Sequence, residues 1–131
     1  MKFEIKRGAQ AEEFETSERC FIREISNAEH DENVSIAIAR VMPGVTTAWH
    51  SLRDTEERYI LIAGEGLVEI GDTPPCAVTV GDVVLIPKDT PQRILNTGVN
   101  DLFFYAVCSP RFQQSNYVDL EQGLEQGPVN T

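Results

Sequence analysis

His50, Glu57 and Gln92 offer an imidazole, a carboxylate and an amide oxygen, three groups that together could hold a metal ion. They lie in two glycine-bounded segments, Pro43–Gly66 and Gly81–Asn96, each patterned as turn, strand, turn and strand. A set with one nitrogen and two oxygen donors suits Fe(II), Mn(II), Ni(II) or Zn(II) better than Cu(I). The residues therefore predict a divalent-metal site with His50, Glu57 and Gln92 as ligands.

Short strands separated by turns dominate the sequence that must position these residues. No stretch before Asn116 keeps a 3.6-residue period, so helices are not expected there. A short helix is predicted at 119–126, and the acidic segment 12–18 is predicted to be a loop or surface turn. The predicted strands are 20–25, 34–42, 46–52, 58–63, 67–70, 78–80, 83–86, 93–95 and 102–107. So many short strands predict an all-β barrel or sandwich with protected edges.

Length and charge restrict the function. A chain of 131 residues predicts one domain over 1–131, with a core at about 19–110 and a C-terminal tail at 111–131. The net charge of −10 argues against partners such as nucleic acid or an anionic membrane surface. No apolar run has the length of a signal peptide core or a bilayer span, so a cytoplasmic location is expected. Cys20, Cys76 and Cys108 are then expected to be free thiols.

The two glycine-bounded segments resemble the two motifs of the cupin family. The first motif is matched by Gly44, His50, Glu57 and Gly64, and the second by Gly81, Pro87 and Asn96. The resemblance implies an all-β fold, the cupin double-stranded β-helix (jelly-roll barrel), with a short C-terminal tail. It also implies that two of the four usual metal-ligand positions have changed, because Leu52 and Gln92 stand where the family has histidines.

Each candidate residue also has a structural interpretation. His50 is either a metal ligand or a hydrogen-bonded core histidine. Glu57 is a ligand, a base or a rim residue, and its neighbour Glu56 would exchange roles with it after a one-residue shift. Gln92 either ligates a metal or hydrogen-bonds a ligand or His50. Tyr59 shares a strand face with Glu57, so Glu57 and Tyr59 are the candidate catalytic residues.

Three functions remain open. The first is a metal-dependent cupin enzyme, such as a dioxygenase, isomerase or lyase, acting on a small organic substrate. The second is a non-catalytic module that binds a small molecule without metal. The third is a metal-independent isomerase or epimerase. A homodimer is expected because the runs RYILIA and DVVLIP are apolar on both strand faces.

Overall fold

The computed structural model describes residues 1–121, and most of its regular structure is antiparallel β-strand. One sheet has the order β1-β2-β3-β10-β5-β8, with bounds Glu13–Glu15, Phe21–Ser26, Ser35–Val41, Leu102–Ser109, Glu56–Ala63 and Val83–Ile86. The other has the order β11-β4-β9-β6-β7, with bounds Tyr117–Asp119, His50–Leu52, Gln92–Asn96, Glu65–Ile70 and Cys76–Thr79. Two 3₁₀ turns, η1 (Gly8–Gln10) and η2 (Gln114–Asn116), complete the described regular structure.

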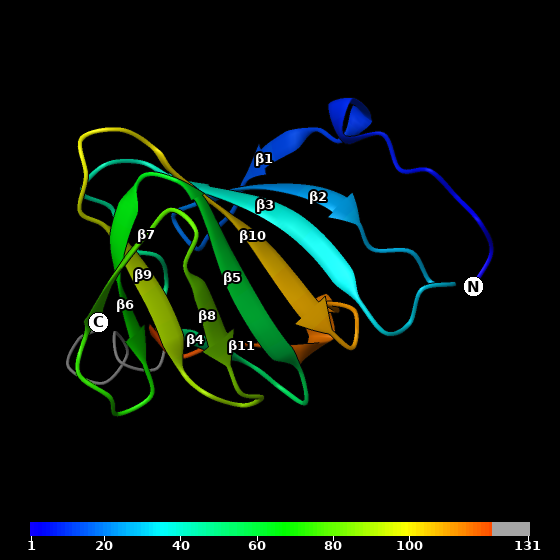
Figure 1. Cartoon of the computed structure of the whole chain (residues 1–131). Helices are drawn as coiled ribbons and strands as arrows, with labels where there is room; N and C mark the ends of the chain where they lie inside the picture. The colour runs from blue at the N-terminus through cyan, green and yellow to red at the C-terminus, as the bar shows by residue number, and fades with distance from the viewer. Residues whose placement is uncertain (122–131) are drawn as a thin grey trace.

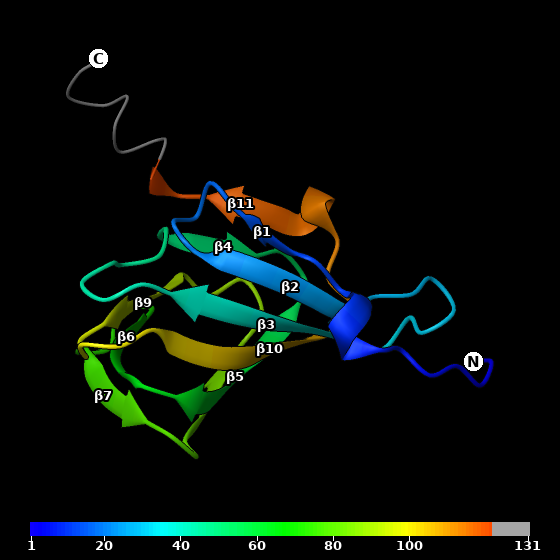
Figure 2. The ribbon, with the colours of Figure 1, turned by 90° about the horizontal axis from the view of Figure 1, so that it is seen from above.

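The two sheets face each other and enclose the core (Figures 1 and 2). Alternate residues of β5 point inward, which buries Tyr59 and Leu61. Ile94 and Leu102 meet them from β9 and β10 in the same apolar cluster. This arrangement confirms the predicted all-β cupin double-stranded β-helix.

Gly64 and Asp89, one in each glycine-bounded segment, lie in tight turns that require a positive φ. Gly64 has φ +88, and a Cβ there would lie 3.0 Å from the Asp101 carbonyl oxygen, so only glycine fits without a shift. Asp89, which stands where the second cupin motif has glycine, adopts φ +64. Its Oδ1 accepts a hydrogen bond from the Asp54 backbone N–H at 2.9 Å. An aspartate whose carboxylate bonds the backbone of another turn therefore occupies a left-handed position usually given to glycine.

A segment near each end of the described chain joins the sheets. β1 pairs with β2, and β11 pairs with β4, so the sheets extend beyond the predicted core of 19–110. Part of the segment 12–18, predicted as a surface turn, is therefore strand. Of the helix predicted at 119–126, the five residues 122–126 lie outside the described residues, and Asp119 at its start belongs to β11. Within residues 1–121, no helix is long and apolar enough to cross a membrane.

Candidate functional site

His50 and Glu57 come from different sheets and line one cavity of about 130 Å³. His50 begins β4, whose three residues are all buried. Glu57 points inward from β5 and is 8% exposed, whereas Glu56 beside it lies on the outer surface. Leu52 lines the same cavity, because residues two apart on a strand share a face. The cavity thus brings together His50, Glu57 and an apolar wall.

The imidazole of His50 is held in a defined orientation. Its Nδ1 lies 2.8 Å from the Ala48 carbonyl oxygen. A carbonyl oxygen can only accept a hydrogen bond, so Nδ1 carries the proton and neutral His50 has its lone pair on Nε2. The ring also stacks on Tyr117 of β11, which lines the same cavity. His50 is therefore arranged to accept a hydrogen bond or a proton through Nε2.

Glu57 is a buried carboxyl group with an unsatisfied atom. The Cys108 thiol donates to Oε2 at 3.7 Å, while Oε1 is buried without a hydrogen-bond partner among the described residues. Burial raises the pKa of Glu57 to about 7, and the negative charge of Glu18 adds to the rise. Hydrogen bonding from the side chains of Gln92 and Cys108 acts in the opposite direction and lowers the pKa of Glu57. Glu57 is therefore set to exchange a proton near neutral pH.

Glu18 is a second carboxyl group in the cavity wall. Burial raises its pKa, the charge of His50 opposes this, and the charge of Asp119 adds to it. Glu18 also contributes to the raised pKa of Glu57, so the two carboxyl groups interact. The inner part of the site therefore contains two carboxyl groups and one imidazole, and Glu24 lines the rim of the same cavity.

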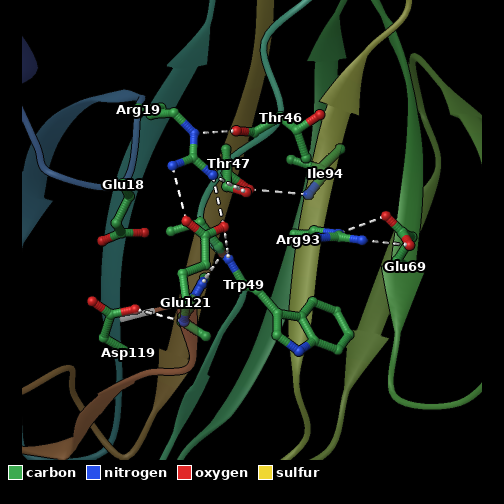
Figure 3. Close-up of polar contacts among 12 residues, drawn as sticks. Glu18, Arg19, Thr46, Thr47, Trp49, Glu69, Arg93, Ile94, Asp119 and Glu121 are labelled. Carbon is green, nitrogen blue, oxygen red and sulfur yellow. Dashed lines mark hydrogen bonds and ion pairs between the residues drawn. The ribbon is translucent and has the colours of Figure 1, made fainter. Parts of the chain in front are cut away.

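A polar clasp beside Glu18 joins Arg19 and Glu121 to each other and to the segment that precedes β4 (Figure 3). Arg19 has φ +67, and its side chain donates to the Thr46 carbonyl oxygen at 2.8 Å. The same guanidinium pairs with both carboxylate oxygens of Glu121, at 2.9 and 2.7 Å. Glu121 also accepts the Trp49 backbone N–H at 2.8 Å. This clasp joins the segment that carries Glu18 to the strand that carries Tyr117.

Gln92 and Tyr59 bond to each other behind the cavity. Gln92 pairs with His50 across β4 and β9, but its side chain is 1% exposed and does not line the cavity. The Tyr59 hydroxyl donates to Gln92 Oε1. The Tyr59 ring packs on Phe104 with centroids 4.4 Å apart. The structure thus places the candidate catalytic residue Tyr59 in the wall behind the cavity, as a neighbour of Gln92.

This arrangement agrees with the family comparison. The cupin-domain family model matches residues 37–108, more than half of the chain. The chain belongs to the cupin family. An uncharacterized protein of Methanocaldococcus jannaschii is 34% identical to this cupin over 108 residues, which cover 81% of this chain and 86% of that protein.

Solved structures share the fold at low sequence identity. One is described as a predicted oxalate decarboxylase from Thermotoga maritima, with TM-score 0.73 and 22% identity over 82% of this cupin and 99% of that chain. A Klebsiella pneumoniae protein with a double-stranded β-helix domain has TM-score 0.72 and 14% identity, covering 90% and 97%. The Streptomyces nucleoside dehydratase Pac13 has TM-score 0.74 and 12% identity, covering 92% of both chains. At these identities the likeness shows the fold alone.

The donor set fits a metal ion poorly. Among residues 1–121, no three His, Cys, Asp or Glu side chains are grouped to hold an ion. Gln92 Oε1 accepts the Tyr59 hydroxyl, and Leu52 has no donor atom. His50 Nε2 and Glu57 remain, whereas catalytic metal sites commonly use three protein ligands. The predicted ligand set of His50, Glu57 and Gln92 is therefore short of donors that reach the cavity.

Sequence reasoning missed Glu18 and Tyr117. Glu18 lies in a polar acidic stretch, where nothing distinguishes it from its exposed neighbours. The one local signal is Cys20, a buried residue two positions later that marks the end of the exposed segment. Tyr117 lies in the stretch assigned to the tail, and its register with Leu52 emerges only from the pairing of β11 with β4.

Proposed function

We propose that this cupin is an enzyme that transfers protons on a small organic molecule without a metal ion. The observation that carries the proposal is Glu57, a buried carboxyl group with a pKa near 7 and an unpartnered oxygen beside a cavity. A group with its pKa near the working pH is well suited to general acid–base catalysis. The low-identity structural neighbours carry different activities, so the choice rests on the site itself.

The two groups have complementary roles in this proposal. Nε2 of neutral His50 accepts a proton from the substrate, because Nδ1 is occupied by the Ala48 carbonyl. The protonated fraction of Glu57 donates a proton to the substrate from the opposite sheet. An acid and a base on different walls of one cavity suit isomerisation, epimerisation or elimination of water. Stacking on Tyr117 keeps the His50 ring in position for its role.

The first test measures the proton affinity of Glu57 directly. The ¹³C signal of its carboxyl carbon, assigned by its loss in Glu57→Gln, should titrate near pH 7. Titration in the range of an exposed glutamate would rule out the acid role. Glu56→Gln is the matched control, because Glu56 is the exposed neighbour and the Glu57 signal should stay unchanged.

The second test looks for catalysis. Tag-free protein is incubated in deuterium oxide with a panel of small metabolites, and mass spectrometry records deuterium uptake or loss of water. Glu57→Gln and His50→Gln should lower the rate by about a hundredfold or more, and Glu56→Gln should keep it. If Glu57 titrates near neutral pH and no compound changes, the non-catalytic binding module is the better interpretation.

A metal-dependent enzyme is the second candidate, supported by two donors that lack other partners. Among the described residues, Glu57 Oε1 has no hydrogen-bond partner, and Nε2 is the unprotonated nitrogen of the His50 tautomer. When bound, Fe, Mn, Ni or Zn would supply a Lewis acid. Loss of the catalysed exchange on chelation, with recovery on adding one of these ions, would favour this candidate over metal-independent proton transfer.

The proposal includes a homodimer formed along β8, the last strand of its sheet. Val80, Val83 and Leu85 are 56%, 54% and 71% exposed there, an apolar patch beside an unpaired strand edge. An antiparallel strand can pair with its own copy about a two-fold axis, so a second copy of this chain fits the edge. A cytoplasmic location belongs to the same proposal, supported by the free thiols of Cys20, Cys76 and Cys108.

A further inference from the structure

The walls of the cavity are unbalanced in charge. Three glutamates line it, namely Glu18, Glu24 and Glu57, and no lysine or arginine is found among the described lining residues. Glu24 lies at the exposed rim, where the Asn27 amide donates to it at 3.0 Å. Glu18 and Glu57 lie deeper, and each is more buried than an ordinary glutamate. Among the described residues, the inner wall therefore has no lysine or arginine to neutralise its carboxyl groups.

An unpartnered atom points to a ligand that donates hydrogen bonds. Glu57 is 8% exposed, and its Oε1 has no partner among the described residues. A buried acceptor of this kind is costly unless something donates to it. Nε2 of neutral His50 is a second acceptor in the same wall. The cavity thus presents acceptors to its contents, which suits a group rich in N–H donors.

The rest of the wall is mainly apolar and aromatic, with Thr16, Ser35 and Gln114 as further polar residues. The apolar and aromatic residues include Phe14, Ile36, Leu52 and Phe112, together with the ring of Tyr117. A volume of about 130 Å³ is close to that of cavities that bind a single benzene ring. Aromatic faces also attract cations. The body of the ligand is therefore compact and apolar, about the size of one ring.

We propose that this cavity binds an organic cation, a primary ammonium group attached to a compact apolar body. The inference rests on the proposed function, because it names the substrate class of the same site. The ammonium group donates to Glu57 Oε1 and offsets the charge of Glu18, and the apolar body packs on Leu52 and Tyr117. A small dianion such as oxalate would face three glutamates with no lysine or arginine among the described lining residues, so the cavity selects against oxalate.

Three probes of one shape and different charge test the inference by calorimetric titration. Benzylammonium should bind about tenfold more tightly than neutral benzyl alcohol, and benzoate should bind more weakly than both.

Variants separate the cavity from the acidic surface. Glu57→Gln and Glu18→Gln should each weaken benzylammonium binding about tenfold and leave benzyl alcohol binding nearly unchanged. Glu56→Gln should leave both affinities unchanged, because Glu56 is exposed on the outer face of β5. Equal benzylammonium affinity in wild type and in both cavity variants would assign binding to the surface and overturn the inference. Benzoate binding as tight as benzylammonium binding would also overturn it.

The binding test does not depend on turnover. One outcome is that the protein prefers benzylammonium while Glu57 titrates like an exposed glutamate. That outcome would refute the proton-transfer function and keep the proposed ligand class. The opposite outcome is that Glu57 titrates near neutral pH while the protein prefers benzoate. That outcome would refute the proposed ligand class and keep the acid role of Glu57.

Discussion

The imidazole of His50 stacks on the phenol ring of Tyr117, with ring centroids 4.9 Å apart and 14° between the planes. The two residues are far apart in the chain and meet because β11 pairs antiparallel with β4, Asp119 opposite His50 and Tyr117 opposite Leu52. The C-terminal strand thus supplies one wall of the cavity and limits the motion of the His50 ring.

Tyr117→Ala should free the His50 ring and open the cavity wall. Loss of the stacked pair should lower the free energy of unfolding by about 0.5–1.5 kcal/mol, in addition to the lost packing. Urea unfolding measures this cost, and the NMR shifts of the His50 ring protons report the loss of the neighbouring ring. Tyr117→Phe keeps the ring and serves as control. Unchanged His50 shifts in Tyr117→Ala would contradict the stacking.

Glu57→Gln should remove a pH-dependent cost of folding. The pKa of Glu57 is raised to about 7 in the folded protein, so the folded state holds this proton more tightly than the unfolded state. The contribution of Glu57 to stability is complete below the ordinary glutamate pKa and is lost as the pH rises through about 7. Over that window, Glu57→Gln should gain roughly 3 kcal/mol in unfolding free energy relative to wild type.

Urea unfolding at several pH values checks this prediction. Glu18 also has a raised pKa, so part of the wild-type pH dependence should persist in Glu57→Gln and shrink further in the Glu18→Gln/Glu57→Gln double variant. Glu56→Gln should follow the wild-type curve. A constant difference between Glu57→Gln and wild type at every pH would show that Glu57 has an ordinary pKa.

Tyr59→Phe should destabilise the protein without touching the cavity. The hydroxyl of Tyr59 satisfies Gln92 Oε1, and both side chains are buried, so its removal leaves a buried acceptor without a partner. The expected loss is about 1–3 kcal/mol of unfolding free energy, measured in urea. Tyr105→Phe is the control, because Tyr105 is only half-buried. If Tyr59→Phe instead weakened ligand binding strongly and left the unfolding free energy nearly unchanged, the Tyr59 hydroxyl would lie in the cavity.

Leu85→Lys should separate a dimer formed along β8. Leu85 is 71% exposed at the unpaired edge of its sheet, so lysine costs the monomer little and places like charges across a two-fold contact. Sedimentation equilibrium should show a dimer for wild type and a monomer for the variant. Val99→Lys is the control, because Val99 is 89% exposed outside the strands and should leave the dimer intact. A wild-type monomer at micromolar concentration would exclude the dimer.

The barrel was predictable because its signals are local. Alternating apolar residues place strands close to β2, β3, β5 and β8. The structure buries Glu57 and exposes Glu56, in agreement with the match of Glu57 to the first cupin motif. Gly64 has the positive φ expected of a turn glycine. These features depend on neighbours in the chain, so one sequence is enough to find them.

The rest of the site depends on contacts between distant segments. Glu18 reaches the cavity through the clasp of Arg19 with Glu121, and Tyr117 arrives through the pairing of β11. Gln92 was predicted from its motif position, but the hydrogen bond from Tyr59 that engages its oxygen is a tertiary contact. Burial and partner choice of this kind decide the pKa of Glu57, and no local pattern reports them.

Leu52→His should create a transition-metal site that the wild-type cavity lacks. Leu52 is 3% exposed, lines the cavity with His50 and Glu57, and lies two residues from His50 on β4. A histidine there adds an imidazole to the two available donors and completes the three ligands that catalytic sites commonly use. Calorimetric titration with Zn(II) or Ni(II) should therefore show binding at least about tenfold tighter than in wild type.

The metal-free form of this variant should lose roughly 2 kcal/mol or more of unfolding free energy, because a buried leucine is replaced by a polar ring. Added Zn(II) should restore part of that loss, since an ion that binds only the folded state stabilises it. The Leu52→His/Glu57→Gln double variant is the control, and its affinity should return towards the wild-type value. Tight Zn(II) binding in that control would mean that Glu57 is not a ligand. A folded Leu52→His protein with wild-type affinity would mean that His50 and Glu57 do not converge on one point in the cavity.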